Sequence, residues 1–256
     1  MLLHVNYNFL ERTAKYDHDT VHSIIDSAPV LHVSFNPTSI DDDPFPTILP
    51  MLGCTGSYTA PDAQETSATA IYLHGHISSR FMRLPSSPSV KDSSLPGIPV
   101  CVAATHVDGI ILAITPFNHS CNYRSAVVHG CATLVEDSRE KMYALKLMTD
   151  NMVPDRWDNT RVPPTEAEMK STGVLRVDIV SASAKIRAYP PGSDKTDVAD
   201  EVTRERVWTG SVPTYIRYGE PIPAVENLSK EVPEYLTHWV KEANQKGDEY
   251  SRKIVS

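Results

Sequence analysis

The stretch HSCNYRSAVVHGCATLV, residues 119–135, changes from a polar cluster into an apolar run that is typical of one long β-strand. Arg124 lies in the polar part, and burying a guanidinium costs several kcal/mol unless an anion or other acceptors compensate its charge. Arg124 at the start of a strand therefore indicates a place where an anionic or oxygen-rich partner is held. The alternative is a turn with a solvent-facing arginine.

Other short runs of apolar or alternating residues also predict strands. They are residues 30–35, 46–52, 69–74, 100–105, 110–114, 175–189 and 212–218. The Asp108-Gly109 dipeptide is a turn signal between two of these runs and predicts a hairpin. Roughly six to eight strands, joined mostly by hairpins and accompanied by a few peripheral helices, indicate a mainly β fold of the barrel type.

Helix-capping residues mark the predicted helices. Asp17 precedes a short helix that ends near Ser27, and Asp137 precedes a longer helix whose methionines fill the core rather than bind a metal. Apolar residues between Val232 and Val240 share one face of a C-terminal helix. No internal repeat and no change of composition appears, so we expect a single domain over residues 1–256.

Composition excludes several classes of function. The chain has 256 residues and a formal net charge of -8, with no run of Lys and Arg, so we expect no nucleic-acid partner. The four cysteines have no C-x-x-C spacing and predict reduced thiols rather than a disulfide framework or a zinc site. No secretory signal and no apolar stretch of roughly 20 residues is present, so we expect a soluble, cytoplasmic protein without membrane contact.

Two further polar clusters lie at predicted strand ends. Residues 74–80 (HGHISSR) combine a glycine, two hydroxyls and Arg80, which together suit an anion; the alternative is a polar turn with two surface histidines. Trp208 stands two residues before Gly210 and is placed to cover a flat ring, or to act as an ordinary core or lid residue. The ten histidines include no H-E-x-x-H motif, so we predict no metal site. A hydrolase is not favoured either, because no G-x-S-x-G motif occurs.

The clusters form an ordered set that covers roughly residues 15–217. Its marks are Tyr16-Asp17, residues 32–35 (HVSF), 72–75 (YLHG), Ser79-Arg80, Asp108-Gly109, residues 119–125 (HSCNYRS), 134–137 (LVED) and 207–213 (VWTGSVP). In this order they resemble the flavin-nucleotide-binding split-barrel family related to pyridoxamine-phosphate oxidase, and within it the nitroimidazole-resistance-type proteins. The chain departs from the pattern at Phe81, where many relatives carry a second basic residue.

The resemblance implies a six-stranded split β-barrel that forms a homodimer, with FMN in the groove between protomers. Residues 15–218 would form the barrel core and residues 228–248 a C-terminal helical extension. The cofactor-binding residues implied are Ile48, Leu49, Pro50, His74 and Gly75 along the flavin ring, Ser78, Ser79 and Arg80 at the phosphate, and Asn122, Tyr123, Arg124, Ser125 and Trp208 elsewhere around the flavin.

The leading functional hypothesis is therefore an FMN-dependent oxidoreductase that acts on a small molecule. His74 or His76 is the candidate proton donor, since an imidazole titrates near neutral pH. The alternative is a non-catalytic protein that binds a flavin or a haem. The basic substrate-phosphate site of the pyridoxamine-phosphate oxidases has no match in this sequence, which disfavours vitamin B6 as the substrate.

Overall fold

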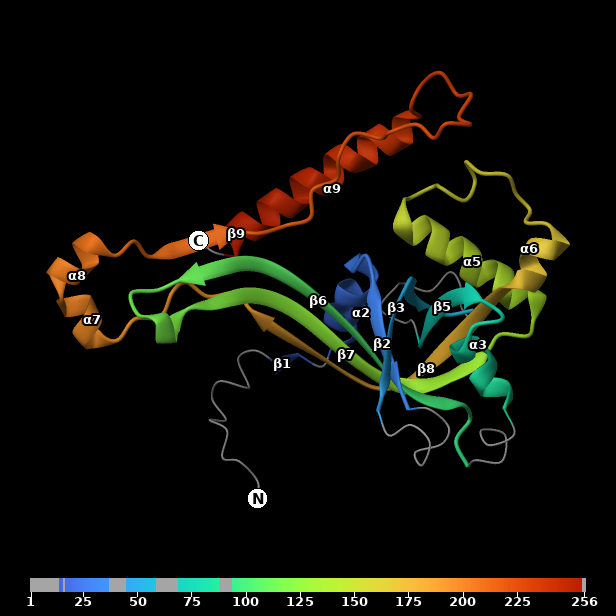
Figure 1. Cartoon of the computed structure of the whole chain (residues 1–256), viewed down its shortest axis with the longest axis horizontal. Helices are drawn as coiled ribbons and strands as arrows, with labels where there is room; N and C mark the ends of the chain where they lie inside the picture. The colour runs from blue at the N-terminus through green and yellow to red at the C-terminus, as the bar shows by residue number, and fades with distance from the viewer. Residues whose placement is uncertain (1–13, 16, 37–44, 59–68, 88–93, 255–256) are drawn as a thin grey trace. The chain divides into compact units, whose positions relative to one another are not determined.

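The computed structural model describes residues 14–15, 17–36, 45–58, 69–87 and 94–254. Over these residues nine strands form a mainly antiparallel sheet in the order β3-β2-β6-β7-β8-β5-β4, while β1 pairs with β8 and β9 with β6 (Figure 1). The strands are β1 Ala14–Lys15, β2 Leu31–Phe35, β3 Thr47–Met51, β4 Gly53–Gly56, β5 Ala70–His76, β6 Ile98–Leu112, β7 Ser120–Leu134, β8 Thr172–Arg187 and β9 Gly210–Pro213. The fold is thus mainly β, as the sequence predicts.

Helices lie between these strands and after the last of them. They are α2 His18–Ser27, α3 Arg80–Arg83, α5 Ser138–Met152, α6 Glu166–Ser171, α7 Lys195–Ala199, α8 Glu201–Arg206 and α9 Glu234–Lys253, with the 3₁₀ turns η2 Leu84–Ser86 and η3 Pro116–Asn118. Asp17 caps α2 by accepting a hydrogen bond from the Thr20 amide, and Asp137 caps α5 in the same manner. No described helix has both the length and the apolar character that a membrane span requires.

The chain divides into two compact units, while the single split-barrel domain expected from the sequence stays a prediction. The core unit comprises Ala14–Thr105 and Ser125–Ala184, and the described part of the C-terminal unit comprises residues 106–124 and 185–254. Strands β6, β7 and β8 are long enough to take part in both units. A division of this kind is hard to predict from sequence, because each unit is assembled from segments far apart in the chain.

The core unit packs alternate side chains of its strands into one apolar interior. In β2, Leu31 and Val33 are fully buried, and so are Ile71 and Leu73 in β5. β3 stands at one end of the sheet order but also contacts β5, so the two ends of the sheet approach each other. α5 packs on β4 and β5 through a second cluster, whose members include Tyr72, Ala144 and Met148.

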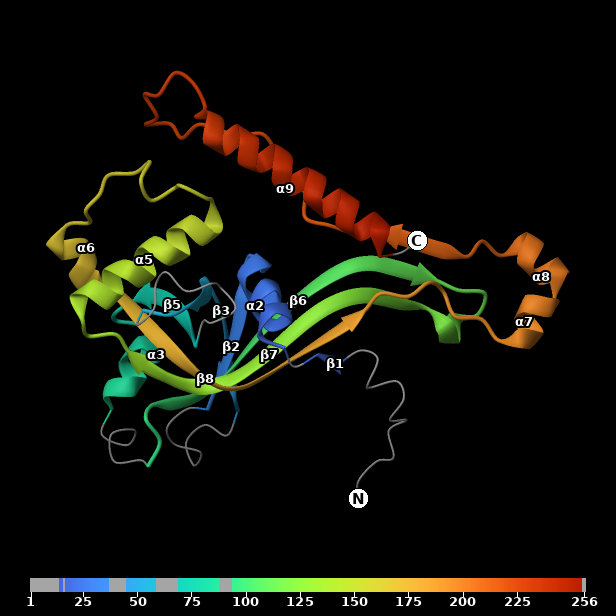
Figure 2. The same cartoon turned by 180° about the vertical axis from the view of Figure 1, so that it is seen from behind.

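The C-terminal unit is organised around α9. The chain that follows β9 runs along this helix, as both views show (Figures 1 and 2). Asn244 in α9 accepts a hydrogen bond from the Tyr218 amide at 2.7 Å and donates one to the Tyr218 carbonyl at 2.9 Å. The Tyr218 ring packs on Trp239 with 4.7 Å between centroids. The predicted C-terminal helix is present, and it spans Glu234–Lys253.

The predicted hairpin at Asp108-Gly109 is wrong. Both residues lie inside β6, which continues without a break from Ile98 to Leu112, and the connection to β7 is made by residues 113–119. A tertiary contact overrides the local turn signal. Asp108 is buried and forms an ion pair with Arg124 of β7, so its side chain stabilises the contact between two strands instead of a turn. The expected count of six strands is not confirmed, since nine are present in the described residues.

Candidate functional site

The turn after β5 presents a row of polar side chains. Ser79 caps α3 by accepting a hydrogen bond from the Met82 amide, and η2 follows α3 directly. Phe81, Met82 and Leu84 are buried. Arg80, Arg83 and Ser86 are exposed, three residues apart. No described residue forms an ion pair with either arginine, so both guanidinium groups are available for an anion.

Two glycines fix α3 on the sheet. Gly75 of β5 and Gly173 of β8 lie opposite each other in the ladder. A Cβ on Gly173 would stand 2.9 Å from Met82 Sδ, and one on Gly75 would stand 3.0 Å from Met82 Cε. The Met82 side chain therefore fills the space that the two missing side chains leave, which holds the arginines in place.

Phe81 accounts for the departure from the family pattern. Its ring is buried and stacks on Phe35 of β2 with 4.3 Å between centroids. Another basic side chain in this segment is Arg83, one helical turn after Arg80. Sequence reasoning missed Arg83, although its spacing of three from Arg80 was a usable signal.

The two predicted catalytic histidines have different surroundings. His74 is half-buried, its Nδ1 is buried, and that atom has no hydrogen-bond partner among the described residues. Burial lowers the pKa of His74, so its imidazole is neutral at pH 7. His76 is exposed, and its Nδ1 accepts hydrogen bonds from the Ser78 amide at 3.2 Å and hydroxyl at 2.6 Å. Because a backbone amide donates to Nδ1, the neutral His76 ring carries its proton on Nε2.

The segment expected along the flavin ring is β3. Ile48 is 60% exposed, Pro50 is exposed and Leu49 is half-buried. The last residue of β3, Met51, lies beside Gly75 of β5: its Cε is 3.9 Å from a Cβ built on Gly75. The structure thus brings the end of β3 next to Gly75, two of the places that the sequence analysis assigns to one site.

Arg124 already has an anionic partner in the chain itself. Its Nε and Nη2 donate to the two Asp108 oxygens, each at 2.9 Å, and its guanidinium lies 4.2 Å from the centre of the Tyr250 ring. Asp108 is only 4% exposed. The predicted oxygen-rich partner of Arg124 is therefore accounted for by a carboxylate 16 residues earlier. A contact between Arg124 and a flavin remains a prediction.

Asn122 is fully buried, and its amide is used within the C-terminal unit. Its Nδ2 donates to the carbonyls of Tyr189 and Ile254, and its Oδ1 accepts from Arg187 and from the Tyr189 amide. These bonds join β7 to the end of α9. Such a complete set of protein partners is typical of a structural residue.

Tyr123 and Ser125 are the neighbours of Arg124 in β7, and Trp208 lies just before β9. The Tyr123 ring lies 5.6 Å from Lys185 Nζ, and Ser125 is half-buried on β7. Trp208 is 66% exposed, and its ring lies over Gly210, where a Cβ would stand 2.6 Å from the indole. The Trp208 ring thus leaves no room for a side chain at position 210. The roles of these residues in cofactor binding stay predictions.

A buried tyrosine and a carboxylate form a polar pair that the sequence analysis did not find. Tyr72 is fully buried, and its hydroxyl donates to Glu140 Oε1 at 2.8 Å. Arg176 donates to the same oxygen at 3.4 Å and to Asp178 at 2.8 Å. Burial and the Glu140 carboxylate raise the pKa of Tyr72. The contact joins β5 to α5 across 68 residues of sequence, so no local signal announces it.

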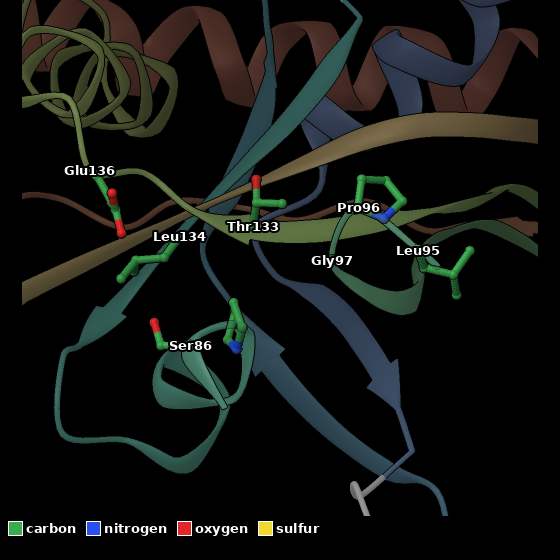
Figure 3. Close-up of a pocket in the computed structure, with 8 residues that line it drawn as sticks. Ser86, Leu95, Pro96, Gly97, Thr133, Leu134 and Glu136 are labelled. Atoms are coloured by element: carbon green, nitrogen blue, oxygen red, sulfur yellow. The ribbon is translucent and has the colours of Figure 1, made fainter. Parts of the chain in front are cut away.

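A pocket of about 280 Å³ lies beside η2 in the core unit (Figure 3). Its lining residues are Pro85, Ser86, Leu95, Pro96, Gly97, Thr133, Leu134 and Glu136. In the part of the chain that the structure describes, no group of three or more His, Cys, Asp or Glu side chains is placed to hold a metal ion.

Comparison with known proteins identifies the family. Residues 17–186 match the family model described as pyridoxamine 5'-phosphate oxidase, and the chain belongs to this family. A search of curated proteins gave no match.

Solved structures extend the comparison beyond the family match. The flavocytochrome Anf3 from Azotobacter vinelandii is 26% identical, with a TM-score of 0.71 over 92% of this chain and 94% of that one. A FAD and haem binding protein from Mycobacterium smegmatis is 22% identical, with a TM-score of 0.70 over 89% of this chain and 97% of that one. A 5-nitroimidazole antibiotic resistance protein from Bacteroides thetaiotaomicron is 18% identical, with a TM-score of 0.47 over 68% of this chain and 87% of that one.

Proposed function

We propose that this chain is a flavin-dependent oxidoreductase that binds FMN, or a larger flavin containing it, at the turn after β5, and acts on a small molecule. The observation that carries the proposal is the pair of exposed arginines, Arg80 and Arg83, which have no ion-pair partner among the described residues. Arginine suits phosphate because its planar fork donates two parallel hydrogen bonds. Membership of the pyridoxamine 5'-phosphate oxidase family supports the same assignment.

The residues of the turn have separate roles in this proposal. Arg80 and Arg83 hold the phosphate, while Ser79 caps the short helix that carries them. The neighbouring end of β3 and Gly75 offer a surface for the flavin ring. When bound, a flavin supplies the one- and two-electron chemistry that amino-acid side chains lack.

His74 contributes a neutral imidazole to this site. Its lowered pKa disfavours the charged form, so at pH 7 it donates or accepts a hydrogen bond rather than acting as a cationic acid. His76, whose ring proton on Nε2 is directed away from Ser78, is the better placed proton donor of the two.

Comparing FMN with riboflavin tests the phosphate site. Arg80→Gln and Arg83→Gln should each weaken FMN binding about 10- to 100-fold, the range of a charge-assisted hydrogen bond. Riboflavin, which has no phosphate, should bind all forms alike. Arg139→Gln, at an arginine whose side chain is 85% exposed, is the matched control. Wild-type protein that retains neither flavin in its absorbance spectrum contradicts the proposal.

Turnover is tested separately from binding. The flavin-loaded protein should be reduced by a nicotinamide donor without oxygen and reoxidised by an added acceptor. Binding without either step would favour the non-catalytic alternative.

A second candidate function, haem binding, is favoured by His119. Its Nδ1 donates to the Thr115 carbonyl at 2.8 Å, which leaves the Nε2 lone pair free on an exposed ring. Haem-ligating histidines commonly donate their other ring N–H in this way. Phe117, two residues earlier, is 95% exposed and offers an apolar contact. The likeness to a flavocytochrome extends beyond residues 17–186 and supports this candidate.

Haem addition tests this candidate directly. Wild-type protein titrated with haemin should develop a Soret band, and His119→Ala should lose or shift it without changing flavin binding. His238→Ala is the control, because His238 is an exposed histidine paired with Glu242. Absence of a Soret band in the wild-type protein would contradict haem binding. A Soret band that is unchanged in His119→Ala would show that His119 is not the residue that ligates the haem.

The homodimer is also part of the proposal. Each unit exposes large apolar side chains, among them Val180 (75%) in the core unit and Ile222 (91%) in the C-terminal unit. Exposed apolar side chains of this kind are available for contact with a second copy of the chain. Light scattering should give twice the mass of one chain, and a monomer at micromolar concentration would contradict it.

A further inference from the structure

We propose that a pocket over β2, β6, β7 and β8 binds an uncharged, mostly apolar carbonyl compound, and that it is the substrate pocket of the proposed oxidoreductase. Its volume of about 400 Å³ lies within the range of small-molecule sites. The inference rests on the proposed function and deepens it, because it states the chemical class of the small molecule. A phosphorylated or otherwise charged substrate does not fit this pocket.

The pocket lies over four neighbouring strands of the sheet. β2 contributes Ser34, β6 contributes Cys101, β7 contributes His129 and β8 contributes Val180. These strands are consecutive in the sheet, in the order β2-β6-β7-β8. Every residue that lines the pocket belongs to the core unit, so the site is formed within one unit of the chain.

The β2 side of the pocket adjoins the strand predicted to lie along the flavin ring. Ser34 pairs with Cys101 of β6 on one side and with Ile48 of β3 on the other. Residues directly opposite each other in an antiparallel ladder lie about 4.5–5.5 Å apart and point to the same face of the sheet. Ser34 and the exposed Ile48 are therefore neighbours on one face. A molecule in the pocket would thus lie beside a flavin ring placed on Ile48.

The lining of the pocket carries no carboxylate, ammonium or guanidinium group among the described residues. Burial raises the pKa of the Cys101 thiol, so this group is also uncharged at pH 7. A charged ligand would lose its hydration there without gaining an ion pair, whereas an apolar molecule gains from burial. The apolar side chains that would contact it are Phe35, Leu95, Pro99, Val100 and Val180.

Three polar side chains of the lining select the functional group of the ligand. They are Ser34, Asn36 and His129, and none of these side chains forms a hydrogen bond or ion pair with another described residue. A hydroxyl, an amide and an imidazole can each donate a hydrogen bond to an oxygen acceptor. A carbonyl oxygen is an acceptor without charge. An apolar molecule that carries a carbonyl therefore satisfies both parts of the lining.

Three probes with the same ring system and different charges test the class of ligand. Acetylnaphthalene is an uncharged ketone, naphthoate carries a negative charge, and naphthylmethylamine carries a positive one. Equilibrium dialysis against the full chain, with and without FMN, measures their affinities at about pH 8, where an ordinary imidazole is neutral. We expect the ketone to bind about 10-fold or more tightly than either ion.

Substitutions of exposed residues test the location of the bound ketone. Val180→Asp places a carboxylate in the apolar wall and should weaken ketone binding about 10-fold or more. Val202→Asp is the matched control, because Val202 is 77% exposed, Val180 is 75% exposed, and Val202 belongs to the C-terminal unit. His129→Ala removes a hydrogen-bond donor and should weaken ketone binding about 3- to 10-fold.

Alkylation of the cysteines gives a second measure of location. With the ketone at about nine times its Kd, one tenth of the pockets are empty, so N-ethylmaleimide should modify Cys101 about 10-fold more slowly. Cys121 is half-buried like Cys101 but belongs to the C-terminal unit. Its rate of alkylation should not change, which makes it the internal reference.

The outcomes separate this inference from the proposed function. A ketone preference that depends on Val180, together with protection of Cys101, supports the inference. Equal affinities for the three probes, or unchanged ketone binding in Val180→Asp, overturns it. A wild-type dimer that binds no probe and becomes a monomer in Val180→Asp also overturns it, since a second copy then covers this face.

FMN binding, measured in parallel, reports on the proposed function alone. Retained FMN without any probe binding overturns the pocket and leaves the flavin site standing. Ketone binding by a protein that takes up no FMN contradicts the oxidoreductase and with it the role of this pocket as a substrate site.

Discussion

Replacing Asp108 by asparagine should destabilise the C-terminal unit through its ion pair with Arg124. Asp108 is 4% exposed, and it accepts two hydrogen bonds of 2.9 Å from the guanidinium. Removing one partner of a buried pair costs about 3–5 kcal/mol, because the other charge is left uncompensated. The Arg124 side chain is 23% exposed and keeps its contact with Tyr250, so we expect about 2–3 kcal/mol.

Urea unfolding of the full chain measures this effect. Trp239 reports on the C-terminal unit, and Trp157→Phe with Trp208→Phe isolates its fluorescence. In a double-mutant cycle with Arg124→Gln, the two losses should fall short of additivity by about 1 kcal/mol or more. The control is Glu166→Gln, which breaks an exposed pair and should leave the transition unchanged. Additive losses, or a loss below about 0.5 kcal/mol for Asp108→Asn, would refute the reasoning.

Three further substitutions test the core unit. Phe81→Ala removes a buried ring that stacks on Phe35 and should cost about 3–5 kcal/mol by urea unfolding, with weaker FMN binding because α3 loses its anchor. Tyr72→Phe removes the donor to Glu140 and should cost about 1–2 kcal/mol; an unchanged midpoint would show that the bond contributes nothing. Burial lowers the pKa of His74 in the folded protein, so the unfolded chain binds a proton at this residue more readily than the folded one. The free energy of unfolding should therefore fall as the pH drops below about 6.5. His74→Gln should flatten that part of the stability profile, and an identical profile would contradict the assignment.

Local signals in the sequence were sufficient for most elements of the fold. Asp17 and Asp137 mark the starts of α2 and α5 because a side chain there caps the helix within a few residues. The alternation of β2 also follows directly from its sequence, with Leu31, Val33 and Phe35 buried. In each case the pattern and the interactions that produce it lie in the same short stretch of chain.

The errors arise where distant residues decide the outcome. Asp108-Gly109 has the composition of a turn, but the ion pair with Arg124 and the ladder to β9 keep it inside a strand. Asn122 looks like a ligand-binding residue, yet its partners are 65 to 132 residues away. The sequence shows that a cation or an amide needs a partner. It does not show which residue supplies it.

The proposed phosphate site shows how such an ambiguity can be resolved. From the sequence, Phe81 stands where a second basic residue is expected, which predicts a phosphate site with one charge fewer. The structure shows that Phe81, Met82 and Leu84 all point into the core, so the exposed positions are those three residues apart. Burial of an apolar side chain is worth about 1.5–3 kcal/mol, more than a surface charge gains from any one position. The core therefore determines which face of the turn meets solvent, and Arg83 becomes the second cation because it shares that face with Arg80.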